Sequence, residues 1–61
     1  MTTVWIIEDN AAFRRATARA LTARGDLTAR EFNRCEDALA ALLSGDRPDV
    51  VLLDIGLPGI D

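Results

Sequence analysis

The chain has 61 residues and a formal net charge of −3, and 49% of its residues are hydrophobic while 28% are charged. This length allows one domain at most, and the composition is typical of a globular chain rather than a disordered one. Ten acidic residues against seven basic ones argue against a nucleic-acid surface, because phosphate binding requires clustered positive charge. The sequence has no histidine, lysine or tyrosine, which excludes histidine catalysis, histidine metal ligation and Schiff-base chemistry.

No segment of the sequence resembles a membrane span or a secretion signal. The longest apolar runs, residues 4–7 and Val50–Leu53, are far too short to cross a bilayer, and no basic and apolar leader opens the chain. We therefore expect a cytoplasmic protein with no membrane partner. Cys35 is the only cysteine, so an internal disulfide and a cysteine zinc site are impossible, and we expect it to be structural.

The first half of the chain predicts a strand, a helix and a second strand. Residues 4–7 are four consecutive apolar residues, typical of a strand covered on both faces. Residues 11–24 predict a helix, with Asn10 as its side-chain cap and Gly25 at its end. Leu27–Phe32 is more polar and predicts an edge strand. The helix has an apolar stripe at helical spacing, formed by Phe13, Ala16, Thr17, Ala20 and Leu21.

The second half predicts another helix and a third strand. Asn33 is the expected cap of this helix, and Glu36 resembles the partner in a capping box. Residues 44–46 end the helix, Val50–Leu53 forms the strand, and residues 58–59 (Pro-Gly) suit a type II turn. The apolar stripe of the second helix consists of Ala38, Leu39, Leu42 and Leu43.

The predicted order of elements, strand-helix-strand-helix-strand, is typical of an α/β fold with a parallel sheet. Right-handed crossovers and the polar second strand give the strand order 2-1-3, with one helix on each face. Ligands of such sheets bind at the carboxyl ends of the strands, where the strand order reverses. Glu8 and Asp9 follow the first strand and Asp54 follows the third, so we expect the three carboxylates to converge there.

Three adjacent carboxylates predict a magnesium site with an oxygen nucleophile. Two unit charges at ~4 Å repel by about 4 kcal/mol at an effective dielectric of roughly 20, and a bound cation removes that repulsion. Mg²⁺ prefers one or two carboxylates together with water and phosphate oxygens. A carboxylate beside the metal can also attack phosphorus and form an aspartyl-phosphate. The plainer interpretation is that these acids are solvated strand ends.

Two sequence blocks carry a resemblance to a known family: VWIIEDN at residues 4–10 and PDVVLLDIGLPG at residues 48–59. Together they resemble the receiver domain of bacterial two-component response regulators, and the resemblance covers the whole chain. It implies that Asp54 is the phosphoacceptor. It also implies a magnesium site, with Asp9 as a direct ligand and Glu8, which replaces the commoner Asp, in contact through water. The full implied set of magnesium ligands is Glu8, Asp9, Asp54 and the backbone carbonyl of Gly56.

A complete receiver domain resembles a flavodoxin-like sheet of order 2-1-3-4-5, so residues 1–61 correspond to its N-terminal half, a truncated flavodoxin-like fold. The resemblance implies a non-enzymatic phosphorelay module that takes a phosphoryl group from a histidine kinase or phosphotransfer protein. The residues of the second block resemble those common in DNA-binding transcriptional regulators, which suggests such a regulator as the parent protein. In the family, a Ser/Thr and a Lys on strands four and five contact the phosphoryl group. We therefore expect the isolated segment to be inactive or weak.

Two other functions remain open from the sequence. A self-associating interaction module would use the apolar edge of Val50–Leu53. A magnesium-dependent phosphotransferase or nuclease would use the same acids, although such sites often carry an Asp-x-Asp pair and Gly56 stands where the second acid would be. Arg14 and Arg15 are interpreted either as part of a solvated basic helix face or as a docking contact for the kinase.

Overall fold

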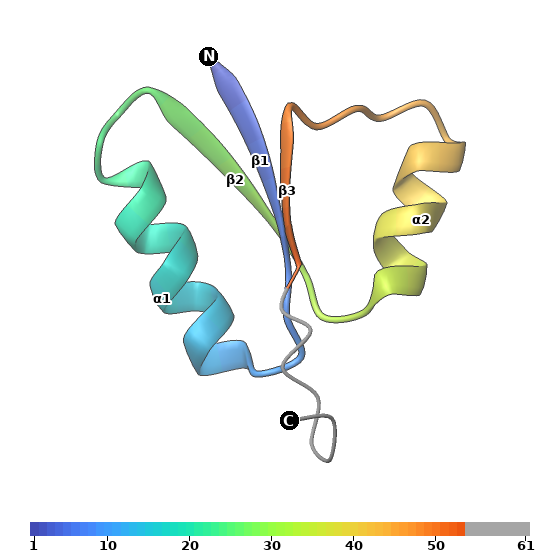
Figure 1. The fold of residues 1–61 in the computed structure, drawn as a ribbon, viewed down its shortest axis with the longest axis horizontal. Helices are drawn as coiled ribbons and strands as arrows, with labels where there is room; N and C mark the ends of the chain where they lie inside the picture. Colours follow the sequence, from blue (N-terminus) through green and yellow to red (C-terminus); the bar gives the residue numbers. More distant parts are fainter. Residues whose placement is uncertain (54–61) are drawn as a thin grey trace.

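The computed structural model describes residues 1–53, which form a three-stranded parallel sheet flanked by two helices (Figure 1). Within these residues the strand order is β2-β1-β3, so the predicted α/β fold and strand order are confirmed. The arrangement is consistent with the truncated flavodoxin-like fold expected from the sequence. The elements are, in chain order, β1 (Thr2–Ile7), α1 (Ala11–Thr22), β2 (Leu27–Phe32), α2 (Cys35–Leu43) and β3 (Val50–Leu53).

The two helices lie on opposite faces of the sheet, as the right-handed crossovers predicted (Figure 1). Successive side chains of a strand point to opposite faces, and β1 therefore supplies residues to two separate small cores. Val4 and Ile6 pack with Ala18 on the α1 side, whereas Trp5 packs on the α2 side. The partners of Trp5 there are Phe32, Ala38 and Ala41.

The strand register brings the carboxyl ends of the three strands to one edge of the sheet. Ile7, the last residue of β1, pairs with Phe32 of β2 and with Leu53 of β3. The β1–α1 and β2–α2 connections leave the sheet at this edge (Figure 1). This is the edge at which open α/β sheets bind their ligands.

The third strand is the least covered part of the described sheet. β3 pairs with β1, and its four residues are each between 39% and 49% exposed. The expectation of an apolar strand with an open edge is therefore met within residues 1–53.

The two predicted helix caps have different outcomes. Asn10 caps α1 as predicted, because its Oδ1 accepts a hydrogen bond from the Phe13 N–H at 3.0 Å. The prediction of a cap at Asn33 is wrong: Arg34 occupies the N-cap position of α2 and makes no side-chain cap hydrogen bond. The helix begins one residue later than predicted, so a side chain without an acceptor falls at the cap and no capping box with Glu36 forms.

The predicted apolar stripe of α1 is only partly correct. Thr17 and Leu21 are half-buried as expected, but the buried residue of the helix is Ala18. The face toward the sheet is rotated toward Arg14, whose side chain is only 13% exposed. The reason is that α1 packs on β1 and β2, and within the described residues it does not extend over β3. Three members of the predicted stripe are therefore exposed: Phe13, Ala16 and Ala20.

Candidate functional site

The acidic pair lies directly after β1, at the carboxyl edge of the sheet. Glu8 is buried, with 6% of its surface exposed, whereas Asp9 is exposed. The other two predicted site residues, Asp54 and Gly56, lie outside the described residues. The structure therefore places Glu8 and Asp9 where the sequence predicted them, and the convergence of Asp54 with this pair remains a prediction.

Hydrogen bonds hold the loop that carries the acidic pair to its surroundings. The Glu8 N–H donates to the carbonyl of Phe32 at 3.0 Å, which extends the β1–β2 ladder by one residue. The Glu8 carboxylate turns back onto its own loop, where Oε2 accepts from the Asn10 N–H at 2.8 Å. Asn10 then caps α1, and its carbonyl accepts from the Arg14 N–H at 2.9 Å. The direction of the Glu8 side chain is thus set by backbone groups of the following turn.

Arg14 is a component of this site that the sequence did not predict. Its Nη1 donates to the Glu8 carbonyl at 2.9 Å, and its Nε lies 3.1 Å from Oε1 of Glu31 on β2. The interpretation of Arg14 as part of a solvated face is therefore wrong, whereas Arg15 beside it is exposed. A usable signal was present, because position 14 shares its helix face with Thr17 and Leu21.

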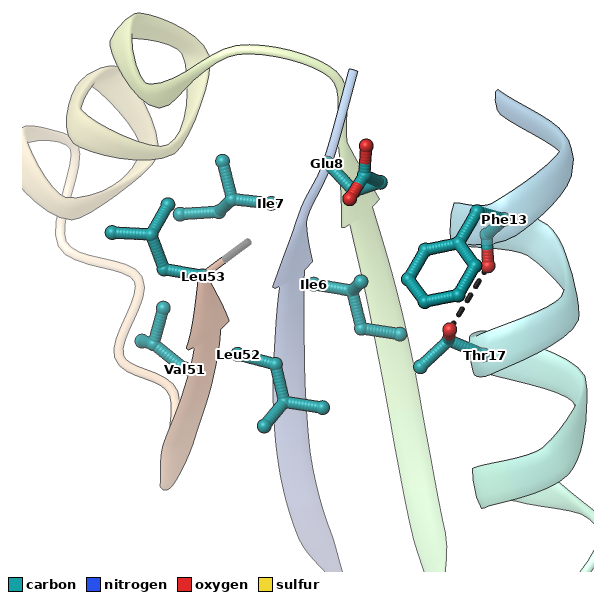
Figure 2. Close-up of a pocket in the computed structure, with 8 residues that line it drawn as sticks. All are labelled: Ile6, Ile7, Glu8, Phe13, Thr17, Val51, Leu52 and Leu53. Atoms are coloured by element: carbon teal, nitrogen blue, oxygen red, sulfur yellow. Dashed lines mark hydrogen bonds between the residues drawn. The ribbon is translucent and has the colours of Figure 1, made fainter. Parts of the chain in front are cut away.

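Two hollows adjoin the acidic pair within the described part of the chain. The larger, about 350 Å³, is mostly apolar, and Figure 2 shows Glu8 at one end of it. Its lining residues are Ile6, Ile7, Glu8, Phe13, Thr17, Val51, Leu52 and Leu53. The smaller, about 150 Å³, lies between the β1–α1 and β2–α2 connections. It is lined by Ile7, Glu8, Asp9, Asn33, Arg34, Cys35 and Leu53.

The oxygen donors at this edge fit a hard cation in part. Glu8 and Asp9 supply two carboxylates, which is the number that Mg²⁺ commonly takes from a protein. Residues 1–53 contain no cluster of three or more histidine, cysteine, aspartate or glutamate residues able to hold a metal ion. The other two predicted ligands, Asp54 and the carbonyl of Gly56, lie outside the described range.

Comparison with known proteins identifies the family. The sequence model of the response regulator receiver domain matches residues 4–61. The chain belongs to this receiver domain family. Its relatives include the DNA-binding transcriptional regulator NtrC of Salmonella typhimurium, with 43% identity over 95% of the chain, and that of Escherichia coli K12, with 41% identity over 95%. The transcriptional regulatory protein AfsQ1 of Streptomyces coelicolor is 43% identical over 100% of the chain.

The receiver domain segment covers a small part of these relatives. It spans 12% of the length of both NtrC proteins and 26% of AfsQ1. No solved structure gives a significant match. The predicted resemblance to response regulators is nevertheless confirmed, and a receiver domain is a module of phosphorelay signalling rather than a conventional enzyme. Among residues 1–53, neither helix is long and apolar enough to span a membrane.

Proposed function

We propose that this receiver domain accepts a phosphoryl group on Asp54 from a histidine kinase or phosphotransfer protein. The observation that carries the proposal is the position of Glu8 and Asp9 at the carboxyl end of β1, beside the last described residue of β3. Ile7 and Leu53 are register partners, and Asp54 follows Leu53 directly in the sequence. The family match extends through this position to residue 61.

The chemistry of the transfer follows from the nucleophile and its neighbours. A carboxylate oxygen of Asp54 forms the new O–P bond while the P–N bond to the donor histidine breaks, and the histidine nitrogen keeps the electron pair. Carboxylates at this edge repel both one another and the incoming phosphoryl group. A bound Mg²⁺ would offset that negative charge.

The two described acids suit different roles toward the metal. Asp9 is exposed, so its carboxylate is free to approach a cation directly. Glu8 is buried and one of its carboxylate oxygens already accepts from the Asn10 N–H, which supports contact through water. We assign the remaining ligands, Asp54 and the carbonyl of Gly56, from the family resemblance alone.

We further propose that residues 1–61 are the N-terminal half of a receiver domain within a larger transcriptional regulator. The sheet order of the described residues supports the first part of this proposal. The names of the relatives, a DNA-binding transcriptional regulator and a transcriptional regulatory protein, support the second. On this basis the 61-residue chain should accept phosphate slowly, because the phosphoryl-contacting Ser/Thr and Lys of the family lie on later strands.

The proposed phosphorylation is tested by incubating the chain with phosphoramidate and Mg²⁺ and measuring intact mass. Wild-type protein should slowly gain the mass of one phosphoryl group, and Asp54→Asn should gain none, because the amide is not a nucleophile. Asp9→Asn should lower the rate by at least tenfold, since a metal ligand is lost. Asp26→Asn is the matched control, because that aspartate lies at the opposite edge of the sheet and is exposed. Equal labelling of wild type and Asp54→Asn would reject the assignment of the phosphoacceptor.

A second candidate function is self-association through β3. Four exposed apolar residues on an edge strand favour it, because unpaired backbone groups beside apolar side chains are a template for a further strand. This function does not exclude the first.

A further inference from the structure

The guanidinium of Arg14 connects the loop that carries Glu8 and Asp9 to strand β2. It donates one hydrogen bond to the Glu8 carbonyl and forms an ion pair with Glu31, at 2.9 Å and 3.1 Å respectively. Its side chain is only 13% exposed, and the hydrogen bond to the Glu8 carbonyl is partly buried, a setting in which it is stronger than in water. An arginine used only for solubility would not be held in this way.

The contact with the Glu8 carbonyl controls the backbone of the acidic pair. The Glu8 carbonyl and the Asp9 N–H belong to one planar peptide unit, so fixing the carbonyl also fixes the plane from which Asp9 departs. The preceding peptide is held as well, because the Glu8 N–H donates to Phe32. The backbone between Glu8 and Asp9 is therefore fixed from both sides, by β2 and by α1.

We propose that Arg14 is a positioning residue for the acidic pair. It orients the Glu8–Asp9 peptide through the Glu8 carbonyl, and Glu31 in turn orients the guanidinium. The part of this inference that concerns magnesium rests on the proposed function, whereas the part that concerns the loop does not. Groups that orient metal ligands from behind commonly change metal affinity by roughly 10-fold to 100-fold when they are removed.

Electrostatics and positioning predict opposite results when Arg14 is replaced. Arg14 is a cation close to a site that would bind a cation, so its charge alone opposes Mg²⁺, and its removal would tighten binding. If positioning is the larger effect, its removal weakens binding. The sign of the change in Mg²⁺ affinity therefore distinguishes the two effects.

The first experiment measures the Mg²⁺ dissociation constant of the 61-residue chain by calorimetry. Arg14→Ala should raise it roughly 10-fold. Arg15→Ala, which removes the same charge from the adjacent exposed position, should leave it within about twofold. Arg14→Lys should not restore wild-type affinity, because one ammonium cannot reproduce the planar fork that reaches both acceptors. Binding by Arg14→Ala as tight as wild type, or tighter, would reject the positioning role at the metal site.

The second experiment needs no metal and measures how strongly the amide groups of the loop are protected from hydrogen exchange. Amide hydrogen exchange of the metal-free chain should be several-fold faster at Asn10 in Arg14→Ala than in Arg15→Ala, because the loop loses its anchor. Exchange at Ile6, inside β1, should be equal in the two variants, which separates local loosening from global destabilisation. Equal exchange at Asn10 would overturn the inference. If the wild-type chain bound no Mg²⁺, the proposed metal site would fail, and the exchange result alone would decide the role of Arg14.

Discussion

Asp49 joins the start of β3 to β1 through both its backbone and its side chain. Its N–H donates to the Thr3 carbonyl at 2.9 Å, and its carboxylate accepts from the Thr3 N–H at 2.8 Å. The next residue pair is Val4 with Val50, so this double contact comes immediately before the β1–β3 ladder. One aspartate therefore stabilises the register that places Leu53 beside Ile7.

Replacing Asp49 by Ala should lower the free energy of unfolding by about 1 kcal/mol, because the Thr3 N–H loses a charged acceptor at the strand edge. Asp49→Asn should lower it by less, since the amide oxygen can still accept. Urea denaturation followed by the fluorescence of buried Trp5 measures both. Asp26→Ala is the control, because within residues 1–53 its carboxylate forms only an exposed pair with Arg24 at 3.6 Å. A loss no larger than that of Asp26→Ala would show that the Asp49 carboxylate does not stabilise the sheet.

At the scale of elements, the sequence predicts the strands and their order better than it predicts the helix faces. Apolar runs and the alternation of strands and helices are local signals. Right-handed crossovers, together with the polar second strand, then give the strand order 2-1-3. The orientation of α1 depends on Arg14, whose partners Glu31 and the Glu8 carbonyl come from other elements. The helical spacing of position 14 with Thr17 and Leu21 indicates the face, but it does not identify these partners.

The candidate site shows the same division between local and non-local information. Glu8 and Asp9 were predicted at the carboxyl end of β1 because an apolar run ends there. The burial of Glu8 was not predicted, since it depends on a turn that aims the Asn10 N–H at its carboxylate. Asp54 and Gly56 lie outside the described residues, so for them the sequence remains the source of the assignment.

The N-terminus of α2 shows how an element can form without its predicted cap. Arg34 occupies the cap position, and its carbonyl, rather than a side chain, accepts from the N–H groups of Asp37 and Ala38. The acidic side chains of Glu36 and Asp37 in the first turn complement the helix dipole. The helix start is therefore stabilised by charge and could be improved by a side-chain acceptor.

Arg34→Ser should raise the free energy of unfolding by about 1 kcal/mol relative to Arg34→Ala, because only serine adds an acceptor for the first-turn N–H groups. The alanine variant is the matched control for the loss of the exposed Arg34–Asp37 pair, whose atoms are 3.8 Å apart. Both variants can be compared by thermal and urea denaturation. Equal stability would mean that the cap of α2 is set by the backbone alone.

At the scale of the whole molecule, the sheet is covered unevenly. The central β1 side chains, Val4, Trp5 and Ile6, are buried on both faces, in two small cores that each include a single helix. β3 receives no comparable cover from the described residues, and its side chains remain half-exposed on both faces. A chain of this size has a thin core, so covering this strand would add substantially to the buried apolar surface.

We therefore expect the 61-residue chain to self-associate through β3. Sedimentation velocity at increasing concentration should show a rising sedimentation coefficient for wild type. Val51→Lys should shift the equilibrium toward monomer, because a charged side chain on an edge strand opposes pairing. Leu43→Lys is the control: Leu43 is 82% exposed but lies on α2, so this variant should associate like wild type. The net charge of −3 opposes association only weakly, and screening in 0.15 M salt over about 8 Å reduces it further. A wild-type monomer at all concentrations would reject the interaction module and leave phosphoryl acceptance as the proposed function of the chain.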